Sequence, residues 1–167
     1  MDESKDIRTK LATASKEGAL LNAIAEIEFD QLETAGSALA DLHHKSATNG
    51  FAYFESLSWS ELSSRDQMRN ATVLEAFLSN LEAPAERISI FIQAVAGEIH
   101  QHNAYYLQNG FQNWASANGS QLPALADLIS AGADDSPFLT PLLHAWWANA
   151  PQDALATAIT FCDDARP

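Results

Sequence analysis

Glutamate and histidine side chains give this sequence its clearest candidates for chemistry. Glu98 and His102 are four residues apart, so both would lie on one side of a helix. His102 continues an apolar stripe through Ile99, and Glu28 would join a similar stripe if its segment were one helix. Helical bundles build metal and cofactor sites from inward-facing Glu and His. The three residues therefore define a metal or catalytic site as an alternative, although we favour a buried, hydrogen-bonded histidine and expect no metal or cofactor.

Other catalytic and ligand-binding patterns are missing from the sequence. The single cysteine, Cys162, cannot form an intramolecular disulfide or a CxxC zinc site. There is no GxSxG turn for a serine nucleophile. None of the seven glycines stands in a phosphate-binding GxxxxGK[ST] or GxGxxG pattern. We therefore lean towards a protein that binds rather than catalyses.

Charge is the strongest feature of the composition. The 167 residues include 22 acidic and 9 basic side chains, which gives a formal net charge of -13. No basic residue lies between Lys16 and Lys45 or between Arg87 and Arg166. Nucleic-acid binding is disfavoured because phosphate contacts need clustered Lys and Arg. Two acidic regions instead predict attraction to a basic protein partner.

The candidate partner contacts are acidic side chains and one tryptophan. Trp146 and Trp147 would diverge by about 100° on a helix, so Trp147 is expected at the edge of the core. Tyr105 and Tyr106 repeat this arrangement. Exposed aromatics beside carboxylates suit a protein-binding surface. The predicted contacts are Glu28, Asp30, Glu33, Asp134, Asp135, Trp147 and Asp153.

These features predict an acidic protein–protein interaction module. In composition, though in no specific motif, the chain resembles small acidic helical proteins that neutralise a partner, such as immunity proteins, antitoxins and phage-encoded inhibitors. This resemblance implies a protein that covers a basic partner. One alternative is a helical-bundle enzyme or cofactor binder, and another is a structural subunit, including a homodimer formed through an exposed apolar helix face.

The elements that must position these residues are expected to be helices. Apolar residues recur at helical spacing almost throughout, and no Asn-Gly turn joins two alternating runs. We predict one all-α domain over residues 1–167, a compact bundle of six to eight helices, with a short HEAT-like stack as the alternative. Residues 19–45 form one helix or two, and a capping box of Asp30 and Glu33 favours a break.

Proline marks the expected starts of later helices, because its missing N–H is tolerated in a first turn. After Pro84 the stripe runs on to Tyr106, which predicts a helix that ends at Asn109 or continues to Trp114. A second stripe comprises Ala71, Leu74, Phe77, Leu78 and Leu81.

Hydropathy excludes a membrane span, because no uncharged apolar run reaches about 18 residues. The polar start MDESKDIRTK lacks the apolar stretch of a secretory signal. We therefore expect a cytoplasmic protein.

Overall fold

The computed structural model describes residues 3–130 and 138–164. Within this part of the chain there are ten α-helices and no strand, so the predicted all-α class is confirmed. The α-helices are α1 (Glu3–Lys16), α2 (Leu20–Ala25), α3 (Leu32–His44), α4 (Gly50–Glu55), α5 (Ser64–Ser79), α6 (Ala85–Ala96), α7 (Ala104–Ala117), α8 (Leu122–Ser130), α9 (Leu139–Asn149) and α10 (Pro151–Asp164). Four 3₁₀ turns join them: η1 (Phe29–Gln31), η2 (Trp59–Glu61), η3 (Gln101–Asn103) and η4 (Gly119–Gln121).

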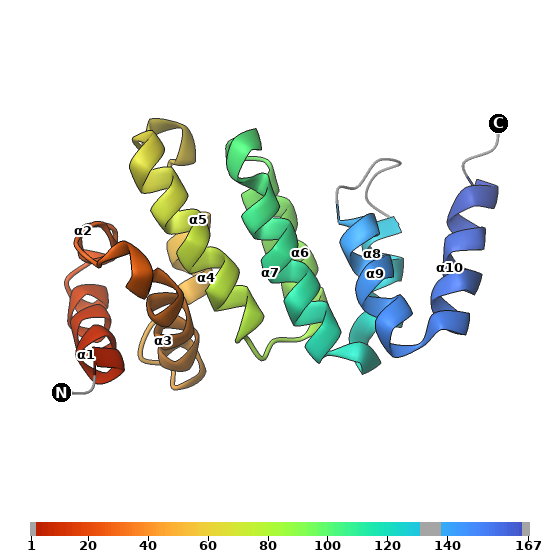
Figure 1. Ribbon diagram of the computed structural model, residues 1–167, viewed down its shortest axis with the longest axis horizontal. Coiled ribbons are helices and arrows are strands. Elements are labelled where there is room, and N and C mark those ends of the chain that lie inside the picture. The colour runs from red at the N-terminus through yellow and green to blue at the C-terminus, as the bar shows by residue number, and fades with distance from the viewer. Residues whose placement is uncertain (1–2, 131–137, 165–167) are drawn as a thin grey trace.

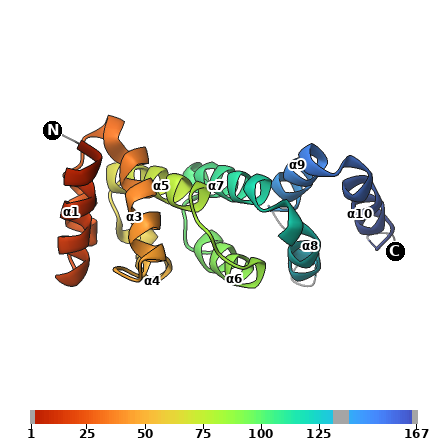
Figure 2. The same cartoon turned by 90° about the horizontal axis from the view of Figure 1, so that it is seen from below.

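The helices of this bundle lie in two layers along one long axis. Figure 1 shows α1, α3, α5, α7, α9 and α10 following one another from the N-terminal to the C-terminal end. In Figure 2 the helices α4, α6 and α8 form the second layer. Each helix of the row packs mainly on its neighbours in the row, an order that the HEAT-like alternative shares.

The helix count exceeds the expected six to eight because two predicted helices are divided and short helices connect the longer ones. Residues 19–45 break into α2, η1 and α3, as the Asp30 signal favoured. However, Gln31 rather than Asp30 is the N-cap of α3, and no side chain caps it. The helix after Pro84 is also divided, because α6 ends at Ala96 and α7 begins at Ala104. Between them, the His100 side chain accepts the His102 backbone N–H and caps η3.

The core lies between the two layers and is rich in phenylalanine. Phe51 and Phe54 of α4, Phe77 of α5 and Phe91 of α6 are buried together. Phe77 meets Phe51 edge-on, with ring centroids 5.8 Å apart. Edge-to-face contact adds to the roughly 1.5–3 kcal/mol that burial of each such side chain supplies. We call these four residues the phenylalanine cluster.

Arg69 of α5 forms a hydrogen bond with the short helix α2. Its side chain is buried, and its Nε donates to the carbonyl oxygen of Ile24 at 3.4 Å. Ile24 lies in the last turn of α2, where backbone carbonyls lack helical partners. The cation therefore stabilises the end of α2 beside the break that leads to α3.

No helix in the described ranges is long and apolar enough to cross a bilayer.

Candidate functional site

A groove is lined by residues of η1, α3, α5 and α7. In Figure 1 the helices α5 and α7 lie in front of α4 and α6. Two of these helices, α3 and α7, approach the backbone of α5 closely. A Cβ atom at Gly36 of α3 would lie 2.5 Å from the carbonyl oxygen of Val73. A Cβ at Gly110 of α7 would lie 3.0 Å from the carbonyl oxygen of Glu75. Two glycines thus let α3 and α7 pack against the backbone of α5.

The groove has a volume of about 520 Å³, within the range of ordinary ligand sites. Its lining combines aromatic rings, carboxylates and small neutral polar groups. The lining residues are Phe29, Glu33, Ser37, Thr72, Glu75, Ala76, Ser79, Tyr105, Tyr106, Asn109 and Asn113. We call this site the acidic groove.

Two carboxylates face the acidic groove from adjacent helices. Glu33 of α3 is exposed, whereas Glu75 of α5 is half-buried. Burial raises the pKa of Glu75 above its usual 4.5, and the nearby negative charge of Glu33 raises it further. A hydrogen bond with the Asn109 side chain acts in the opposite direction and lowers this pKa. The charged form of Glu75 therefore lacks full solvation and would gain from a cation.

Aromatic side chains stand at the edge of the acidic groove. Phe29 is 53% exposed and Tyr105 is 50% exposed. The rings of Tyr105 and Tyr106 lie 4.0 Å apart, centroid to centroid. Their hydrogen bond raises the pKa of Tyr105 to about 12, so this phenol is uncharged at neutral pH. Half-exposed rings beside carboxylates resemble the anchors of protein interfaces.

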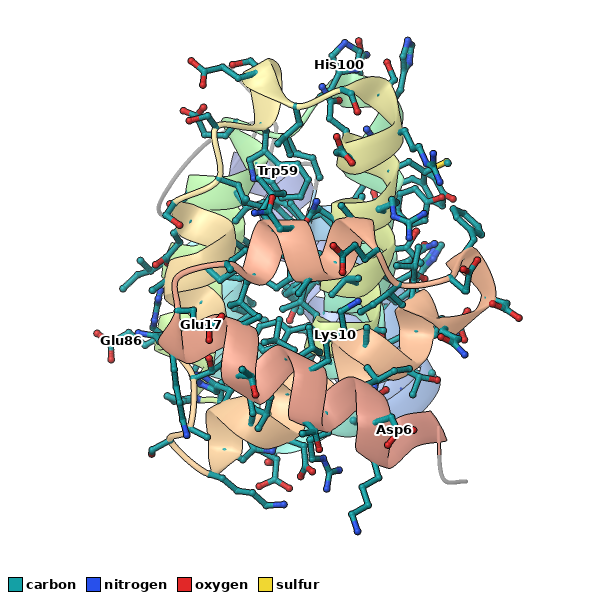
Figure 3. The ribbon with its side chains drawn as sticks, turned by 90° about the vertical axis from the view of Figure 1, so that its left-hand side faces the viewer. Asp6, Lys10, Glu17, Trp59, Glu86 and His100 are labelled. Carbon is teal, nitrogen blue, oxygen red and sulfur yellow. The ribbon has the colours of Figure 1, made fainter. Side chains whose placement is uncertain are left out.

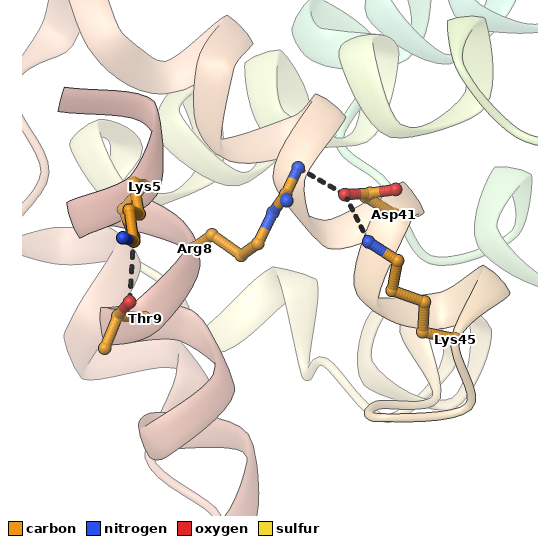
Figure 4. Close-up of polar contacts among 5 residues, drawn as sticks. All are labelled: Lys5, Arg8, Thr9, Asp41 and Lys45. Atoms are coloured by element: carbon orange, nitrogen blue, oxygen red, sulfur yellow. Dashed lines mark hydrogen bonds and ion pairs between the residues drawn. The ribbon is translucent and has the colours of Figure 1, made fainter. Parts of the chain in front are cut away.

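The acidic groove has no lysine or arginine in its lining among the residues that the structure describes. The neighbouring hollow between α1 and α3 differs, as Figure 4 shows for Asp41. There Asp41 pairs with Arg8 and, at 3.3 Å, with Lys45. Asp41 is thus neutralised within the chain, while Glu33 and Glu75 have no ion pair within the described residues.

Three of the predicted partner contacts lie around the break before α3. Glu28 is the N-cap of η1, Asp30 lies within η1, and both are exposed. Glu33, one turn later, lines the acidic groove. These three acids surround Phe29 in the sequence, so the break presents negative charge and an exposed ring together.

The remaining predicted contacts do not join this surface. Trp147 of α9 is 57% exposed, as its place beside buried Trp146 predicted, and Asp153 of α10 is exposed. Both lie towards the C-terminal end of the row in Figure 1. Asp134 and Asp135 lie outside the described residues.

The favoured burial of His102 is wrong, and the alternative site of Glu28, Glu98 and His102 gains no support from the structure. All three side chains are exposed. His102 lies in η3 rather than in a helix continuous with the apolar stripe, so it is not a core residue. In the part of the chain that the structure describes, no group of three or more His, Cys, Asp or Glu could hold a metal ion.

Glu75 and Phe29 are among the residues of the acidic groove that the sequence analysis missed. Glu75 has the spacing of an ordinary solvated helix face, and nothing in the sequence shows that α7 packs beside it. Phe29 carries a usable signal, since it is a large aromatic amid Glu26, Glu28 and Asp30, in a segment where a helix break was expected.

Comparison with known protein families, curated proteins and solved structures gave no match for this chain.

Proposed function

We propose that this chain is a protein–protein interaction module whose acidic groove binds a basic protein partner. The observation that carries the proposal is a groove in which two carboxylates, without an ion pair among the described residues, lie beside exposed aromatic rings. Rings supply buried contact area on binding, and charges speed encounter with a partner of opposite sign. The net charge of -13 adds long-range attraction of the same sign.

Within this proposal, the specific role is inhibition by covering the partner's basic surface. The acidic composition, shared with immunity proteins and other small inhibitors, supports this role. A partner that uses lysines and arginines in its own activity would lose that activity when they are covered.

A display experiment tests the proposal without knowledge of the partner. The full chain is immobilised, and random peptides are selected on it at low salt and again near physiological salt. We expect enrichment of peptides that combine basic and apolar residues, with binding that weakens as salt rises, because exposed charges are screened beyond about 8 Å at physiological ionic strength.

A pair of charge-matched variants then locates the binding. Glu33→Gln with Glu75→Gln removes both groove carboxylates, and we expect affinity to fall at least about tenfold. The control, Glu17→Gln with Glu86→Gln, changes net charge equally at exposed positions that do not line the groove. Figure 3 shows Glu17 and Glu86 at one edge of the molecule. Equal losses in both variants would leave only general charge attraction and refute the groove as the site.

A second candidate function is that of a self-associating subunit. Leu155 and Ile159 are one turn apart on α10, and both are exposed, as is Trp147 on α9. Large exposed apolar side chains at one end of a row of helices favour a contact with another chain. Light scattering over a wide concentration range tests it, and a monomer at every concentration would exclude it.

A further inference from the structure

We infer that the acidic groove is a recognition site for an arginine side chain of the partner. This inference rests on the proposed function and deepens it, because it names the residue that the groove distinguishes from other basic residues. The inference requires that the carboxylates, the aromatic rings and the neutral polar side chains of the groove all contact the same cation.

The two carboxylates are arranged to share a cation. Glu33 and Glu75 line one groove from neighbouring helices, and the negative charge of Glu33 contributes to the raised pKa of Glu75. A guanidinium between them would relieve this repulsion. Its five N–H donors in a planar fork can reach two carboxylates and an amide oxygen such as that of Asn113. An ammonium has three donors on one atom and spans less of the groove.

The aromatic edge favours arginine for a second reason. Tyr105 offers a half-exposed, uncharged ring beside the carboxylates. A guanidinium stacks on such a ring and is less strongly hydrated than an ammonium, so it loses less on entering a partly enclosed groove. A lysine of the same charge would keep more of its water and bind more weakly.

The chain already contains this combination of groups elsewhere. The guanidinium of Arg87 lies over the ring of Phe51, 4.3 Å from its centroid. The same guanidinium pairs with Glu55 at 2.7 Å. Arg87 therefore makes, with Phe51 and Glu55, the ring contact and the ion pair that a partner's arginine would make in the acidic groove. Arg8 likewise supplies a cation to the hollow beside α1.

Titration with short peptides tests the inference on the full chain. Three blocked pentapeptides carry Arg, Lys or citrulline at the centre between glycines, so that charge and shape are separated. NMR spectra follow the side-chain amides of Asn109 and Asn113. We expect the Arg peptide to bind about fivefold more tightly than the Lys peptide, and the neutral citrulline peptide at least about tenfold more weakly than the Arg peptide.

Aromatic variants separate stacking from charge. Tyr105→Leu should weaken the Arg peptide about fivefold and the Lys peptide less, while Tyr105→Phe, which keeps the ring, should retain the Arg preference. Ile90→Ala removes an exposed apolar side chain of α6 that does not line the groove and should change neither.

The outcomes distinguish this inference from the proposed function. Equal affinity for the Arg and Lys peptides would overturn arginine recognition, and an Arg preference unchanged in Tyr105→Leu would overturn the stacking role of Tyr105. Selected basic peptides that still depend on Glu33 and Glu75 would leave the proposed function standing in that case. A citrulline peptide that binds as well as the Arg peptide would overturn the inference too, because no cation would then be recognised.

Discussion

The two sides of helix α5 differ in their packing and in their charge. On one side, Phe77 packs into the phenylalanine cluster, where the nearby cation Arg87 is paired with Glu55. On the other side, only two residues away, Glu75 faces the acidic groove without an ion pair among the described residues. One side is packed and electrically balanced, and the other is polar and negative.

The difference separates stability from recognition within one helix. Buried rings contribute free energy of folding through apolar burial and tight packing. A half-buried carboxylate without a cation contributes little to folding or opposes it. A group that adds little to folding and lies in a groove is a candidate for binding. Four substitutions test this division, and they are ordered by the expected size of their effect on stability.

The largest effect is expected for Phe77→Ala. Removal of this ring leaves a cavity among Phe51, Phe54 and Phe91, and we expect a loss of about 3–5 kcal/mol in the free energy of unfolding. Phe29→Ala is the control, because it removes the same ring from the exposed edge of the acidic groove. It should change stability by less than about 0.5 kcal/mol. Urea unfolding at pH 7 measures both, and similar losses would contradict the division.

A smaller loss of stability is expected for Gly36→Ala, where α3 packs closely against α5. The new methyl group would lie 2.5 Å from the Val73 carbonyl oxygen and from the Ala76 Cβ, so α3 must move away from α5. We expect a loss of about 1–3 kcal/mol. Gly119→Ala places a methyl no closer than 3.5 Å to other atoms and should cost little. Thermal unfolding compares the two, and equal midpoints would show that the helices yield without cost.

The sequence predicted the apolar stripes well because burial in a helix follows spacing. The five stripe residues from Ala71 to Leu81, four of them in α5, are all buried, as are Ile88, Phe91, Ile92, Val95 and Ile99. The break between α6 and α7 was missed because Ile99 and Tyr106 continue the same spacing across it. Gly97 and the cap by His100 interrupt the helix without interrupting the pattern.

The acidic groove could be predicted only in part. Glu33 belonged to an acidic run that the sequence makes visible, and exposed aromatics were expected at Tyr105–Tyr106. The juxtaposition of Glu75 with these residues depends on helix packing at Gly36 and Gly110, which is long-range information. Local spacing locates charges along the chain but not the helices that approach them in space.

The pH dependence of stability distinguishes the balanced side of α5, where His43 contacts Phe77, from the side that faces the acidic groove. Burial lowers the pKa of His43 below its usual 6.5, and the neighbouring His44 and Arg87 lower it further, although a hydrogen bond with the Thr48 backbone raises it. The neutral ring accepts the Gly50 N–H through Nδ1 at 3.3 Å. Because the folded pKa lies below the unfolded one, the stabilisation is full above about pH 6.5. It is lost as pH falls from there through the folded pKa.

His43→Gln should therefore flatten the decline in stability just below pH 6.5, because the variant has no group whose folded pKa is lowered at this position. His144→Gln, at an exposed position on α9, is the control and should leave the decline unchanged. Urea unfolding at half-unit steps between pH 5 and 7.5 measures the slopes. A decline that persists in the His43 variant would assign the effect to other groups.

The smallest effect on stability is expected for Glu75→Gln, and its sign is what matters. Burial raises the folded pKa of Glu75, so its ionisation is easier in the unfolded chain. Its contribution to stability is full below the unfolded pKa and is lost as pH rises through the folded pKa. At pH 7 the amide removes this penalty, so the stability of the variant should equal or slightly exceed that of the unaltered protein, within about 0.5 kcal/mol.

Glu55→Gln is the control. It breaks the pair with Arg87 on the balanced side of α5 and should instead lower stability, by up to about 1 kcal/mol. Urea unfolding of both variants at pH 7 gives the two signs side by side. A clear loss for Glu75→Gln would mean that this carboxylate serves the fold, and the division between the two sides of α5 would then fail at the residue on which it most depends.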